Sequence, residues 1–422
     1  MKAHSQVIVI GAGLAGLSCA RALAEASVEC IVLESSDRVG GRLGSDRHQG
    51  FVLDRGFAVF LDAYPEARRQ LDLEALELKT FDCGARIQWG ERHAVLLDPW
   101  RHPFAAWRQV LNPVARWSDY PRLLELRGRM LAGDDDAGDA ESDGCSAGEL
   151  LARAKLSPQL IDGFFRPFFG GVFFDRELET SARMLRFVFR MFARGRAALP
   201  AGGMQAIADQ IHAELPADAV RLHHRVVSIE EGAVVMDSGQ RCPAEMVVIA
   251  TDHEQAVKLV GDVLPPRRWR GTSTLYFAAE KPPLTEALLV LDGSGTGPVN
   301  HLAVPSNVCP TYAPAGAALV CANVVGSEHE GDGLEAAVHR QLREWFGAAV
   351  DGWKHLRTYH IPRALPDQSP AALSARPQAS RLGPGRFLCG DHLNTASING
   401  ALQSGRLAAE AVLHERSAEV IC

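Results

Sequence analysis

The sequence predicts an α/β fold in which a Rossmann-like domain is interrupted by a second, α+β domain. A strand, a glycine turn, a helix and a strand follow one another between Val7 and Leu33. A short apolar run of the buried-strand type recurs at Met246–Ala250, and the pattern strand, turn, helix recurs at the C-terminal end, from Arg386. Between these pieces the sequence is first mostly helical and then rich in short strands, as expected for an inserted domain.

The composition is that of a globular protein with more than one unit. A chain of 422 residues with 47% hydrophobic and 23% charged residues is too long for one ordinary core. The formal net charge of −7 argues against nucleic acid as a partner, because nucleic-acid binders normally carry a basic excess. The sequence contains no run of about 18 apolar residues, so no membrane-spanning helix is predicted.

The cysteines and histidines do not form metal-binding patterns. Nine cysteines are widely spaced without a CxxC pair, which indicates reduced thiols rather than a disulfide framework or a zinc site. The fifteen histidines show no metal-ligand spacing, so no metal is expected. The first residues, MKAHSQ, differ from a signal peptide and lead directly into a strand, so we expect a cytoplasmic protein.

The first strand, helix and strand are Val7–Ile10, Leu14–Ala26 and Glu29–Leu33. Between the first strand and the helix stands the glycine pattern Gly11-Ala-Gly13-Leu-Ala-Gly16. Its first glycine permits a tight turn, its second lets backbone approach a pyrophosphate, and its third lets helix and strand pack closely. The helix N-terminus then offers free N–H groups to the phosphates, and Glu34 ends the second strand, where it can accept from ribose hydroxyls. These features predict a dinucleotide site.

The remaining elements divide the chain between two domains. Residues 81–194 are predicted to be mostly helical, with a solvated acidic loop at Ala132–Gly148. Further elements are expected as strands at Thr272–Ala278, Leu288–Asp292, Leu319–Val325 and Leu356–Ile361, and as a helix at Leu334–Phe346. The cofactor domain is therefore assigned to 1–80, 196–265 and 376–422, and the substrate domain to 81–195 and 266–375.

Several motifs indicate which dinucleotide is bound. Ser35-Ser-Asp-Arg38-Val-Gly40-Gly41-Arg42 resembles the second glycine motif of the FAD-dependent family that includes amine oxidases, protoporphyrinogen oxidases and phytoene desaturases. Gly390-Asp391, the segment Ser397–Gly405 and the strand that begins at Val226 resemble that family's later motifs, in the same order. The resemblance implies a domain of the glutathione-reductase type. It also implies FAD held noncovalently, because no cysteine stands in the family's flavin-linking context.

Within this family the segments Gly56–Phe60 and Ala63–Pro65 look most like plant-type phytoene desaturases. Amine oxidases usually place an aromatic residue in the last motif, where this chain has Ser397-Ile398-Asn399, which counts against an amine substrate. The residues that the fingerprint and the resemblance together assign to the cofactor are Gly11, Gly13, Leu14, Ala15, Gly16, Glu34, Ser35, Arg38, Gly40, Gly41, Arg42, Gly56, Phe57, Val226, Gly390, Asp391, Ser397, Ile398 and Asn399.

The segment Phe164–Gly195 holds nine of the seventeen phenylalanines. The resemblance places the substrate cavity near this part, so some rings are expected to line a cavity for a hydrophobic small molecule and others to fill the core. A helix at 182–195 would carry Arg183, Arg186, Arg190 and Arg194 on one face. Two interpretations stay open: a core-facing helix with solvated arginines, or a peripheral contact with the inner face of a membrane.

The expected function is that of an FAD-dependent oxidoreductase, desaturase-like, which transfers a hydride from a hydrophobic substrate to flavin N5. The alternatives are an amine or porphyrinogen oxidase, and a non-catalytic FAD-bearing protein that presents a lipid. His301, His360 and His392 are interpreted as structural, and Arg55 and Tyr64 stand near the flavin segment without an assigned role. No catalytic residue and no oligomeric state are assigned.

Overall fold

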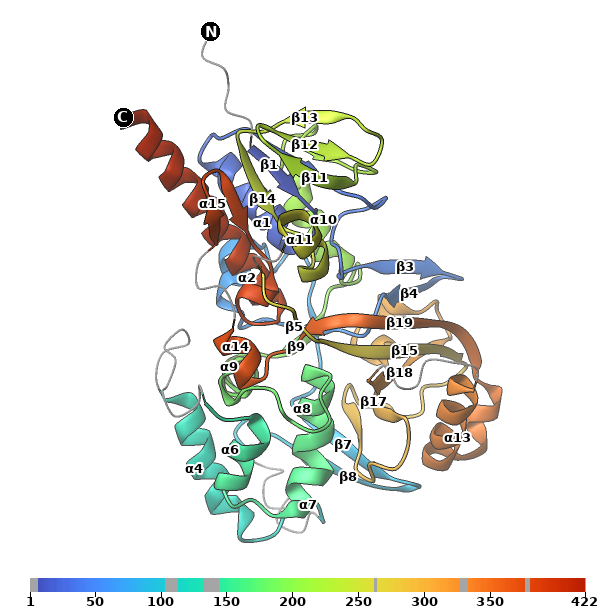
Figure 1. Ribbon diagram of the computed structural model, residues 1–422. Helices are drawn as coiled ribbons and strands as arrows, with labels where there is room; N and C mark the ends of the chain where they lie inside the picture. Colours follow the sequence, from blue (N-terminus) through green and yellow to red (C-terminus); the bar gives the residue numbers. More distant parts are fainter. Residues whose placement is uncertain are drawn as a thin grey trace.

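The computed structural model describes residues 7–102, 113–132, 144–261, 264–326, 333–375 and 380–421 (Figure 1). The first six residues and most of the acidic segment expected as a loop lie outside these ranges. The chain forms an upper domain around a mostly parallel sheet and a lower domain in which helices flank a mixed sheet (Figure 1). The α/β fold class is confirmed.

The sheet of the upper domain has six strands in the order β10-β2-β1-β14-β21-β20. All neighbouring pairs are parallel except β20 and β21. The strands are β1 (Val7–Ile10), β2 (Cys30–Leu33), β10 (Val220–Arg221), β14 (Met246–Ile249), β20 (Arg381–Gly383) and β21 (Arg386–Leu388). They come from three stretches that are far apart in the sequence, so this sheet forms only when the beginning, middle and end of the chain meet.

Strand β1 is buried on both faces, which explains its uninterrupted apolar sequence. Val7 and Val9 pack in the same cluster as helices α1 (Leu14–Glu25), α10 (Gln205–Ala213) and α15 (Ile398–Ile421). Ile8 and Ile10 pack with a three-stranded antiparallel sheet on the other face. That sheet consists of β11 (Val226–Glu230), β12 (Ala233–Met236) and β13 (Arg241–Pro243). Because successive side chains of a strand point to opposite faces, β1 contributes to one core on each side of the sheet.

The lower domain is built on a seven-stranded sheet in the order β19-β15-β18-β17-β16-β7-β8. Its strands are β7 (Gly84–Trp89), β8 (Arg92–Leu97), β15 (Trp269–Ala279), β16 (Leu289–Asp292), β17 (Val299–Ala303), β18 (Ala318–Val325) and β19 (Lys354–Pro366). Helix α13 (Leu334–Phe346) packs on one part of this sheet, and α8 (Arg166–Phe173) packs on β16, β17 and β18. The expected strands and the helix at 334–346 are confirmed.

The prediction of mostly helical structure from residue 81 is wrong at its start. Strands β7 and β8 form a hairpin across Gly90, and β7 pairs in parallel with β16. The partner strand comes about 200 residues later in the chain, so local periodicity alone could not reveal it. The helices that follow are α4 (Asp119–Leu131), α6 (Ala147–Arg153), α7 (Pro158–Leu160), α8 and α9 (Ala182–Arg194).

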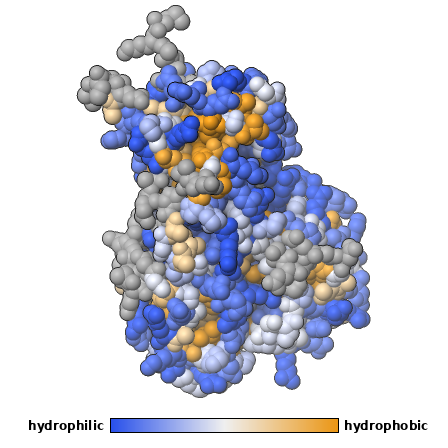
Figure 2. Space-filling view, viewed as in Figure 1, coloured by the Kyte–Doolittle hydropathy of each residue, from blue (hydrophilic) through white to orange (hydrophobic). Residues whose placement is uncertain are grey.

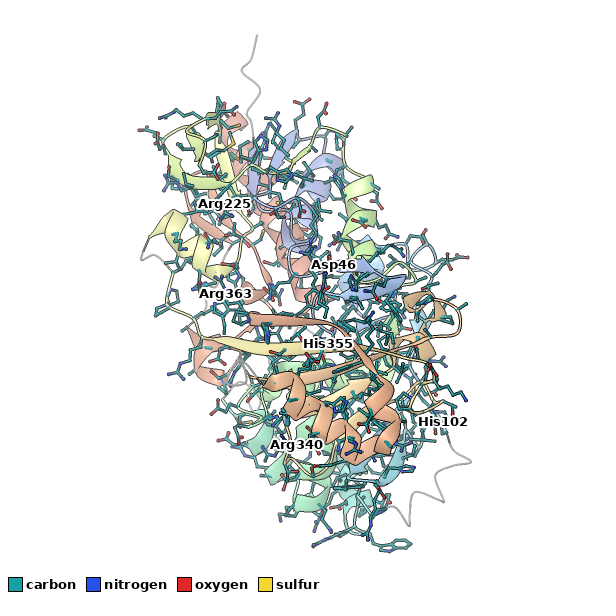
Figure 3. All side chains as sticks on the ribbon, turned by 90° about the vertical axis from the view of Figure 1, so that its right-hand side faces the viewer. Asp46, His102, Arg225, Arg340, His355 and Arg363 are labelled. Atoms are coloured by element: carbon teal, nitrogen blue, oxygen red, sulfur yellow. The ribbon has the colours of Figure 1, made fainter. Side chains whose placement is uncertain are left out.

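Small elements join the two domains. They include the hairpin β3 (Ser45–His48) and β4 (Phe51–Asp54), helices α2 (Pro65–Gln70) and α11 (His253–Val260), and a sheet of β5 (Phe60–Leu61), β9 (Ala197–Leu199) and β6 (Lys79–Thr80). Asp46 lies at this junction (Figure 3) and accepts hydrogen bonds from Arg55, Arg357 and Tyr359. The hairpin of the upper domain is therefore tied to strand β19 of the lower one.

The four arginines of α9 differ in their exposure to solvent. Arg190 is only 3% exposed, and its guanidinium donates to the carbonyls of Met130, at 2.7 Å, and Ala132. These carbonyls belong to the C-terminal end of α4, where helix carbonyls lack partners within the helix. Of the four arginines, all described, only Arg194 is largely exposed. Arg183 and Arg186 are partly exposed, so only Arg190 departs from the expected exposed face, and a membrane contact of this helix stays a prediction.

Candidate functional site

A single cavity of about 1350 Å³ runs from the upper domain into the lower one. At its upper end it is lined by the glycine turn after β1, and at its lower end by the phenylalanines of α8 and α9. Of the nineteen residues assigned to the cofactor, the cavity is lined by Gly11, Gly13, Leu14, Ala15, Glu34, Ser35, Gly40, Gly41, Arg42, Gly56, Phe57, Val226, Gly390, Asp391, Ser397 and Ile398. Gly16, Arg38 and Asn399 do not line it.

The turn between β1 and α1 leaves room for a ligand at one glycine and none at another. A Cβ atom built on Gly13 would meet nothing within 4 Å, and Gly13 lines the cavity. A Cβ on Gly16 would lie 1.9 Å from the carbonyl oxygen of Gly11. No described side chain caps α1 at its N-terminus, and its first turn has no acidic residue. Its N–H groups and its partial positive charge therefore remain for an anionic group such as a pyrophosphate.

Glu34 lies at the end of β2 and is almost fully buried. Its carboxylate accepts hydrogen bonds from the N–H of Ala12, at 2.7 Å, and from the N–H of Ser36, at 2.8 Å. These two bonds fix the carboxylate beside the glycine turn. Because an ionised carboxylate offers about four acceptor positions, Glu34 can still accept from ribose hydroxyls in the cavity.

The second glycine motif lies directly on the first. The N–H of Gly40 donates to the carbonyl of Ala12 at 2.8 Å, and a Cβ on Gly41 would lie 3.2 Å from the Cα of Gly13. Gly40 has a φ of +103°, which side chains rarely adopt. Arg38 does not line the cavity, and its guanidinium donates to the carbonyls of Gly41 and Leu43 and to Gln205. These bonds hold the loop together, and a contact of Arg38 with the cofactor stays a prediction.

Arg42 joins this loop to the C-terminal motif. Its guanidinium forms an ion pair with the buried carboxylate of Asp391 at 2.5 Å and donates to the carbonyl of Ala364 at 3.0 Å. Both Arg42 and Asp391 line the cavity. This ion pair therefore connects the second glycine motif and the C-terminal motif in one wall of the cavity.

The start of helix α15 forms another part of the same wall. The Ser397 hydroxyl accepts from the N–H of Gly400 at 3.0 Å, and Ser397, Ile398 and Ala401 line the cavity. The first-turn N–H groups of a helix have no partner within it, so this end favours negative charge in the cavity. The Asn399 side chain instead accepts from the N–H of Glu66 at 2.8 Å, which fastens α2 to α15.

Phe57 lies where the two domains meet. Its N–H donates to the Thr274 hydroxyl of β15 at 3.2 Å, and its ring lies 5.6 Å from the His301 ring. Behind this segment the buried carboxylate of Asp54 accepts from Ser45, from the N–H of Met204 and from Tyr312. Burial raises the pKa of Asp54 to about 6. These bonds fix the position of the Gly56–Phe57 backbone.

The phenylalanines of α8 and α9 separate into two groups. Phe165, Phe169 and Phe173 are buried and stacked along one side of α8. Phe164, Phe168 and Phe192 are more open and contact one another. All six line the cavity. Phe187 of α9 is buried in the core and does not line the cavity, so the rings of this segment divide between cavity and core as expected.

The lower end of the cavity reaches the surface at a ring of exposed apolar residues, which we call the rim. It consists of Trp100, Trp117 and Leu124, which are 49%, 70% and 59% exposed and all line the cavity. The Arg127 guanidinium lies 4.1 Å from the centre of the Trp100 ring. In Figure 2 the visible face is mostly hydrophilic, with hydrophobic side chains gathered in separate clusters, one of them over the α4–α7 region. The three rim residues are among the large hydrophobic side chains that the described residues expose, and each also lines the cavity.

Several lining residues were not predicted from the sequence, although a rule of sheet topology points to them. Thr251, Asp252 and Gln255 line the cavity directly after β14. Ligands of open parallel sheets bind beyond the carboxyl ends of the strands, and the buried strand at 246–250 had been identified. The rim had no such signal, because residues 100, 117 and 124 belong to no common pattern.

The three histidines considered from the sequence have different surroundings. His301 lines the cavity. The His360 ring bonds to the Ser273 hydroxyl at 2.9 Å, and the buried His392 ring lies 5.4 Å from the His253 ring. Burial lowers the pKa of His392 to about 3. His360 and His392 do not line the cavity.

The described residues form neither a metal cluster nor a membrane-spanning helix. Within those ranges, no group of three or more His, Cys, Asp or Glu side chains could hold a metal ion. Within the same ranges, no helix is both long and apolar enough to span a membrane.

Comparison with known proteins identifies related chains. Residues 14–413 match the family described as flavin containing amine oxidoreductase. The 15-cis-phytoene desaturase of an Oncidium hybrid cultivar is 23% identical over 97% of this chain and 78% of its own length. Polyamine oxidase 2 of Arabidopsis thaliana is 53% identical over 57 residues, which are 13% of this chain and only 12% of that protein.

Solved structures share the fold at low identity. A putative protoporphyrinogen oxidase from Exiguobacterium superposes with a TM-score of 0.72 at 17% identity, covering 98% of this chain and 99% of that one. A putrescine oxidase bound to putrescine superposes with a TM-score of 0.71 at 17% identity, covering 97% and 99%. These likenesses confirm a Rossmann-like fold of the FAD-binding type.

Proposed function

Because the chain belongs to the family of flavin-containing amine oxidoreductases, we propose that it oxidises a hydrophobic small molecule in a desaturase-like reaction. FAD is the cofactor of this family, and the open cradle at Gly13 with its uncapped helix end fits the pyrophosphate of such a cofactor. When bound, the flavin supplies an N5 atom that accepts a hydride from the substrate. We further propose that FAD is held noncovalently.

The residues of the upper wall would each hold one part of the cofactor. The N-terminus of α1 would face the pyrophosphate, and Glu34 would accept from a ribose. The N-terminus of α15 at Ser397–Ile398 would face the pyrimidine side of the ring, where negative charge develops on reduction. Arg42 and Asp391 would close the wall between them.

The continuity of the cavity carries the proposal of a hydrophobic substrate. The same cavity that begins at the glycine turn ends among the phenylalanines of α8 and α9. Such a site binds apolar ligands by excluding water, and the rings of Phe164, Phe168 and Phe192 offer broad apolar faces.

The positions of the acidic residues speak against an amine as the preferred substrate. The described carboxylates that line the cavity are Glu34, Asp252 and Asp391 in the upper wall and Asp82 and Asp98 in the lower part. The N–H of Asp98 donates to the carbonyl of Cys83, which keeps Asp98 close to Asp82, and the N–H of exposed Trp100 donates to the Asp98 side chain. Asp98 also lies 3.7 Å from the Arg101 guanidinium, which donates to the carbonyl of Phe192, so the carboxylate nearest to this phenylalanine is already paired with a cation.

The test is whether substrates reduce the bound flavin. The purified protein is expected to carry a flavin spectrum that bleaches under anaerobic conditions with an apolar polyene or a fatty acyl lipid. The variant Phe168→Ala should need more of the same substrate for half-maximal bleaching, while Leu407→Ser on the outside of α15 should not. Bleaching by polyamines or porphyrinogens alone would replace the proposal with one of those oxidases. Bleaching by none of these compounds would favour the non-catalytic alternative.

We also propose that the rim is the surface through which an apolar substrate enters from a membrane. The exposure of Trp100, Trp117 and Leu124 at the cavity mouth supports this proposal. Tryptophan is favoured where an apolar layer meets water, and Arg127 beside Trp100 suits an anionic surface. The rim is thus a second candidate for a peripheral membrane contact, beside helix α9.

A further inference from the structure

His301 is a buried side chain with one nitrogen bound to protein and one left over. It lies on β17, is 4% exposed and lines the cavity. Its Nδ1 lies 3.1 Å from the side-chain nitrogen of Asn300, whereas Nε2 has no hydrogen-bond partner among the described residues. A polar atom that is held in a buried site without a protein partner is a candidate for ligand binding.

The neighbouring bonds fix which nitrogen carries the proton. The Asn300 amide nitrogen donates to the carbonyl of Pro167 at 2.8 Å, so the amide cannot be turned to place its oxygen there. The second hydrogen of the same amide group then points to His301 Nδ1, which must accept. Burial lowers the pKa of His301 to about 3, so the ring is neutral. The remaining proton therefore sits on Nε2, which is a hydrogen-bond donor.

The donor lies close to the proposed reaction site. The His301 ring lies 5.6 Å from the ring of Phe57, in the segment expected beside the flavin. A Cβ atom built on Gly171 of α8 would lie only 2.7 Å from His301 Nδ1. Helix α8 therefore packs tightly on this imidazole and holds its orientation.

We infer that His301 Nε2–H binds an uncharged oxygen of the substrate, and that the substrate is an apolar molecule with a carbonyl, ether or hydroxyl group. The inference rests on the proposed function, because it concerns the substrate part of the same cavity. A pure hydrocarbon would leave the imidazole N–H buried without a partner. An ammonium group would bring a second donor to a donor, and the Asp98 carboxylate that could balance its charge is already paired with Arg101.

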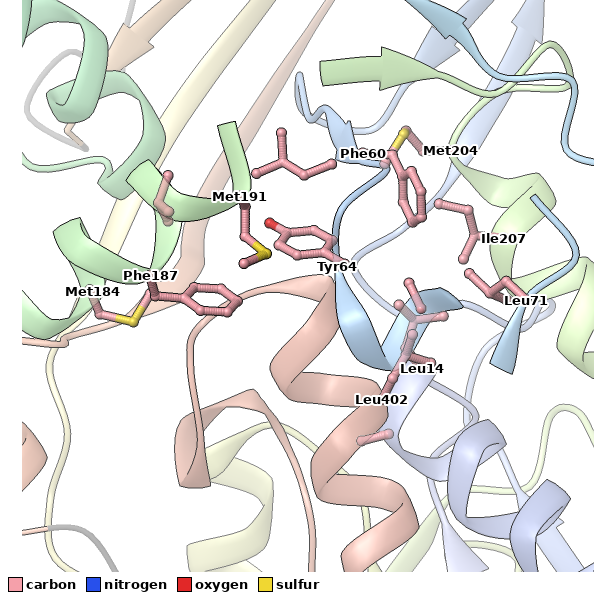
Figure 4. Close-up of a cluster of buried hydrophobic side chains, with 14 of the residues drawn as sticks. Leu14, Phe60, Tyr64, Leu71, Met184, Phe187, Met191, Met204, Ile207 and Leu402 are labelled. Carbon is pink, nitrogen blue, oxygen red and sulfur yellow. The ribbon is translucent and has the colours of Figure 1, made fainter. Parts of the chain in front are cut away.

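A second polar group in the cavity provides the internal comparison. Tyr64 is 6% exposed and lines the cavity. Its hydroxyl has no hydrogen-bond partner among the described residues. Its ring is stacked on Phe187 at 6.0 Å, and Figure 4 shows it near Met191 of α9. Tyr64 could receive the same oxygen, so the experiment must distinguish the two donors.

The experiment measures the affinity of the FAD-loaded protein for three probes of nearly the same shape by titration calorimetry. The probes are diphenylmethane, benzophenone and protonated aminodiphenylmethane. Benzophenone is expected to bind about three- to tenfold more tightly than diphenylmethane, the range given by one net hydrogen bond. Protonated aminodiphenylmethane is expected to bind more weakly than benzophenone. Equal affinity for the ketone and the hydrocarbon, or tighter binding of the amine, would overturn the inference.

Three variants assign the effect. His301→Leu should remove the preference for benzophenone, and His301→Gln, which keeps an N–H donor, should retain part of it. Tyr64→Phe should leave the preference in place; if Tyr64→Phe removes it and His301→Leu does not, the assignment to His301 is wrong. The flavin spectrum of each variant reports whether the site is intact. A protein that shows the ketone preference without retaining flavin would contradict the proposed function alone, and one that retains flavin without the preference would contradict this inference alone.

Discussion

A methyl group added at Gly13 and one added at Gly16 should have opposite effects on the protein. At Gly13 a Cβ meets nothing within 4 Å, and the φ of −70° suits any residue. Gly13→Ala should therefore keep the stability of the apo-protein within about 1 kcal/mol, the cost of replacing glycine by alanine at a helix N-cap. The methyl group would instead occupy the space where backbone must approach the pyrophosphate.

The expected loss of cofactor affinity follows from the bonds that this approach permits. Hydrogen bonds to a charged group contribute about 1.5–3 kcal/mol each, so losing two of them weakens FAD binding by about 3–6 kcal/mol, or roughly 10²- to 10⁴-fold. At Gly16 a Cβ would lie 1.9 Å from the Gly11 carbonyl oxygen, 1.5 Å short of the 3.4 Å at which ordinary contact begins. Because the obstacle is backbone, α1 must move, and we expect Gly16→Ala to destabilise the apo-protein by about 1–3 kcal/mol or more.

The assay pairs urea denaturation of the apo-proteins with equilibrium dialysis against FAD. Gly13→Ala should leave the denaturation midpoint nearly unchanged and lose flavin, whereas Gly16→Ala should lower the midpoint. If Gly13→Ala retains FAD with wild-type affinity, the cofactor does not lie over the glycine turn and the assignment of the upper wall is refuted.

Three further outcomes are expected. Glu34→Gln should weaken FAD binding about tenfold in equilibrium dialysis, because the ionised carboxylate that holds two backbone N–H groups and a ribose becomes a neutral amide. Burial raises the pKa of Asp54 from its ordinary 3.8 to about 6, so its contribution to stability is present at low pH and is lost as the pH rises through about 6. Asp54→Asn should remove this component, up to about 3 kcal/mol, from the pH profile of urea denaturation. The double variant Trp117→Ser, Leu124→Ser should reduce sedimentation with anionic liposomes severalfold, while Leu407→Ser, also an exposed leucine, should not.

Each of these outcomes has a clear opposite. Unchanged FAD affinity in Glu34→Gln would place the ribose elsewhere. If the stability of the wild type and of Asp54→Asn depends on pH in the same way, the pKa of Asp54 is not raised in the folded protein. Equal liposome binding by all the proteins would remove the rim from the membrane proposal.

The parts of the site that could be predicted are those in which function requires a local pattern. The glycine turn, the helix end and Glu34 lie within one strand–helix–strand unit, so their spacing alone places them together. The ion pair of Arg42 and Asp391 joins residues 349 apart in sequence, and no local pattern connects them. The sequence could indicate both motifs but not the bond between them.

The errors arose where a local pattern had more than one tertiary solution. The arginine spacing of α9 left a solvated face or a membrane contact open, and neither interpretation included the burial of Arg190, which donates to a carbonyl at the end of α4. The strand β7 was missed because its partner β16 lies far along the chain. Likewise, the role of His301 depends on Asn300 and Pro167, and only the folded arrangement shows which nitrogen is free.

The contact between the first and last helices has a consequence for biosynthesis. The Ser18 hydroxyl of α1 donates to the carbonyl of Leu402 in α15 at 2.7 Å, across 384 residues of chain. A nascent polypeptide that emerges from the ribosome therefore holds its glycine turn long before the opposite wall has been translated. Flavin capture is expected only after the C-terminal helix has left the exit tunnel, and a message truncated before that helix should yield a colourless product.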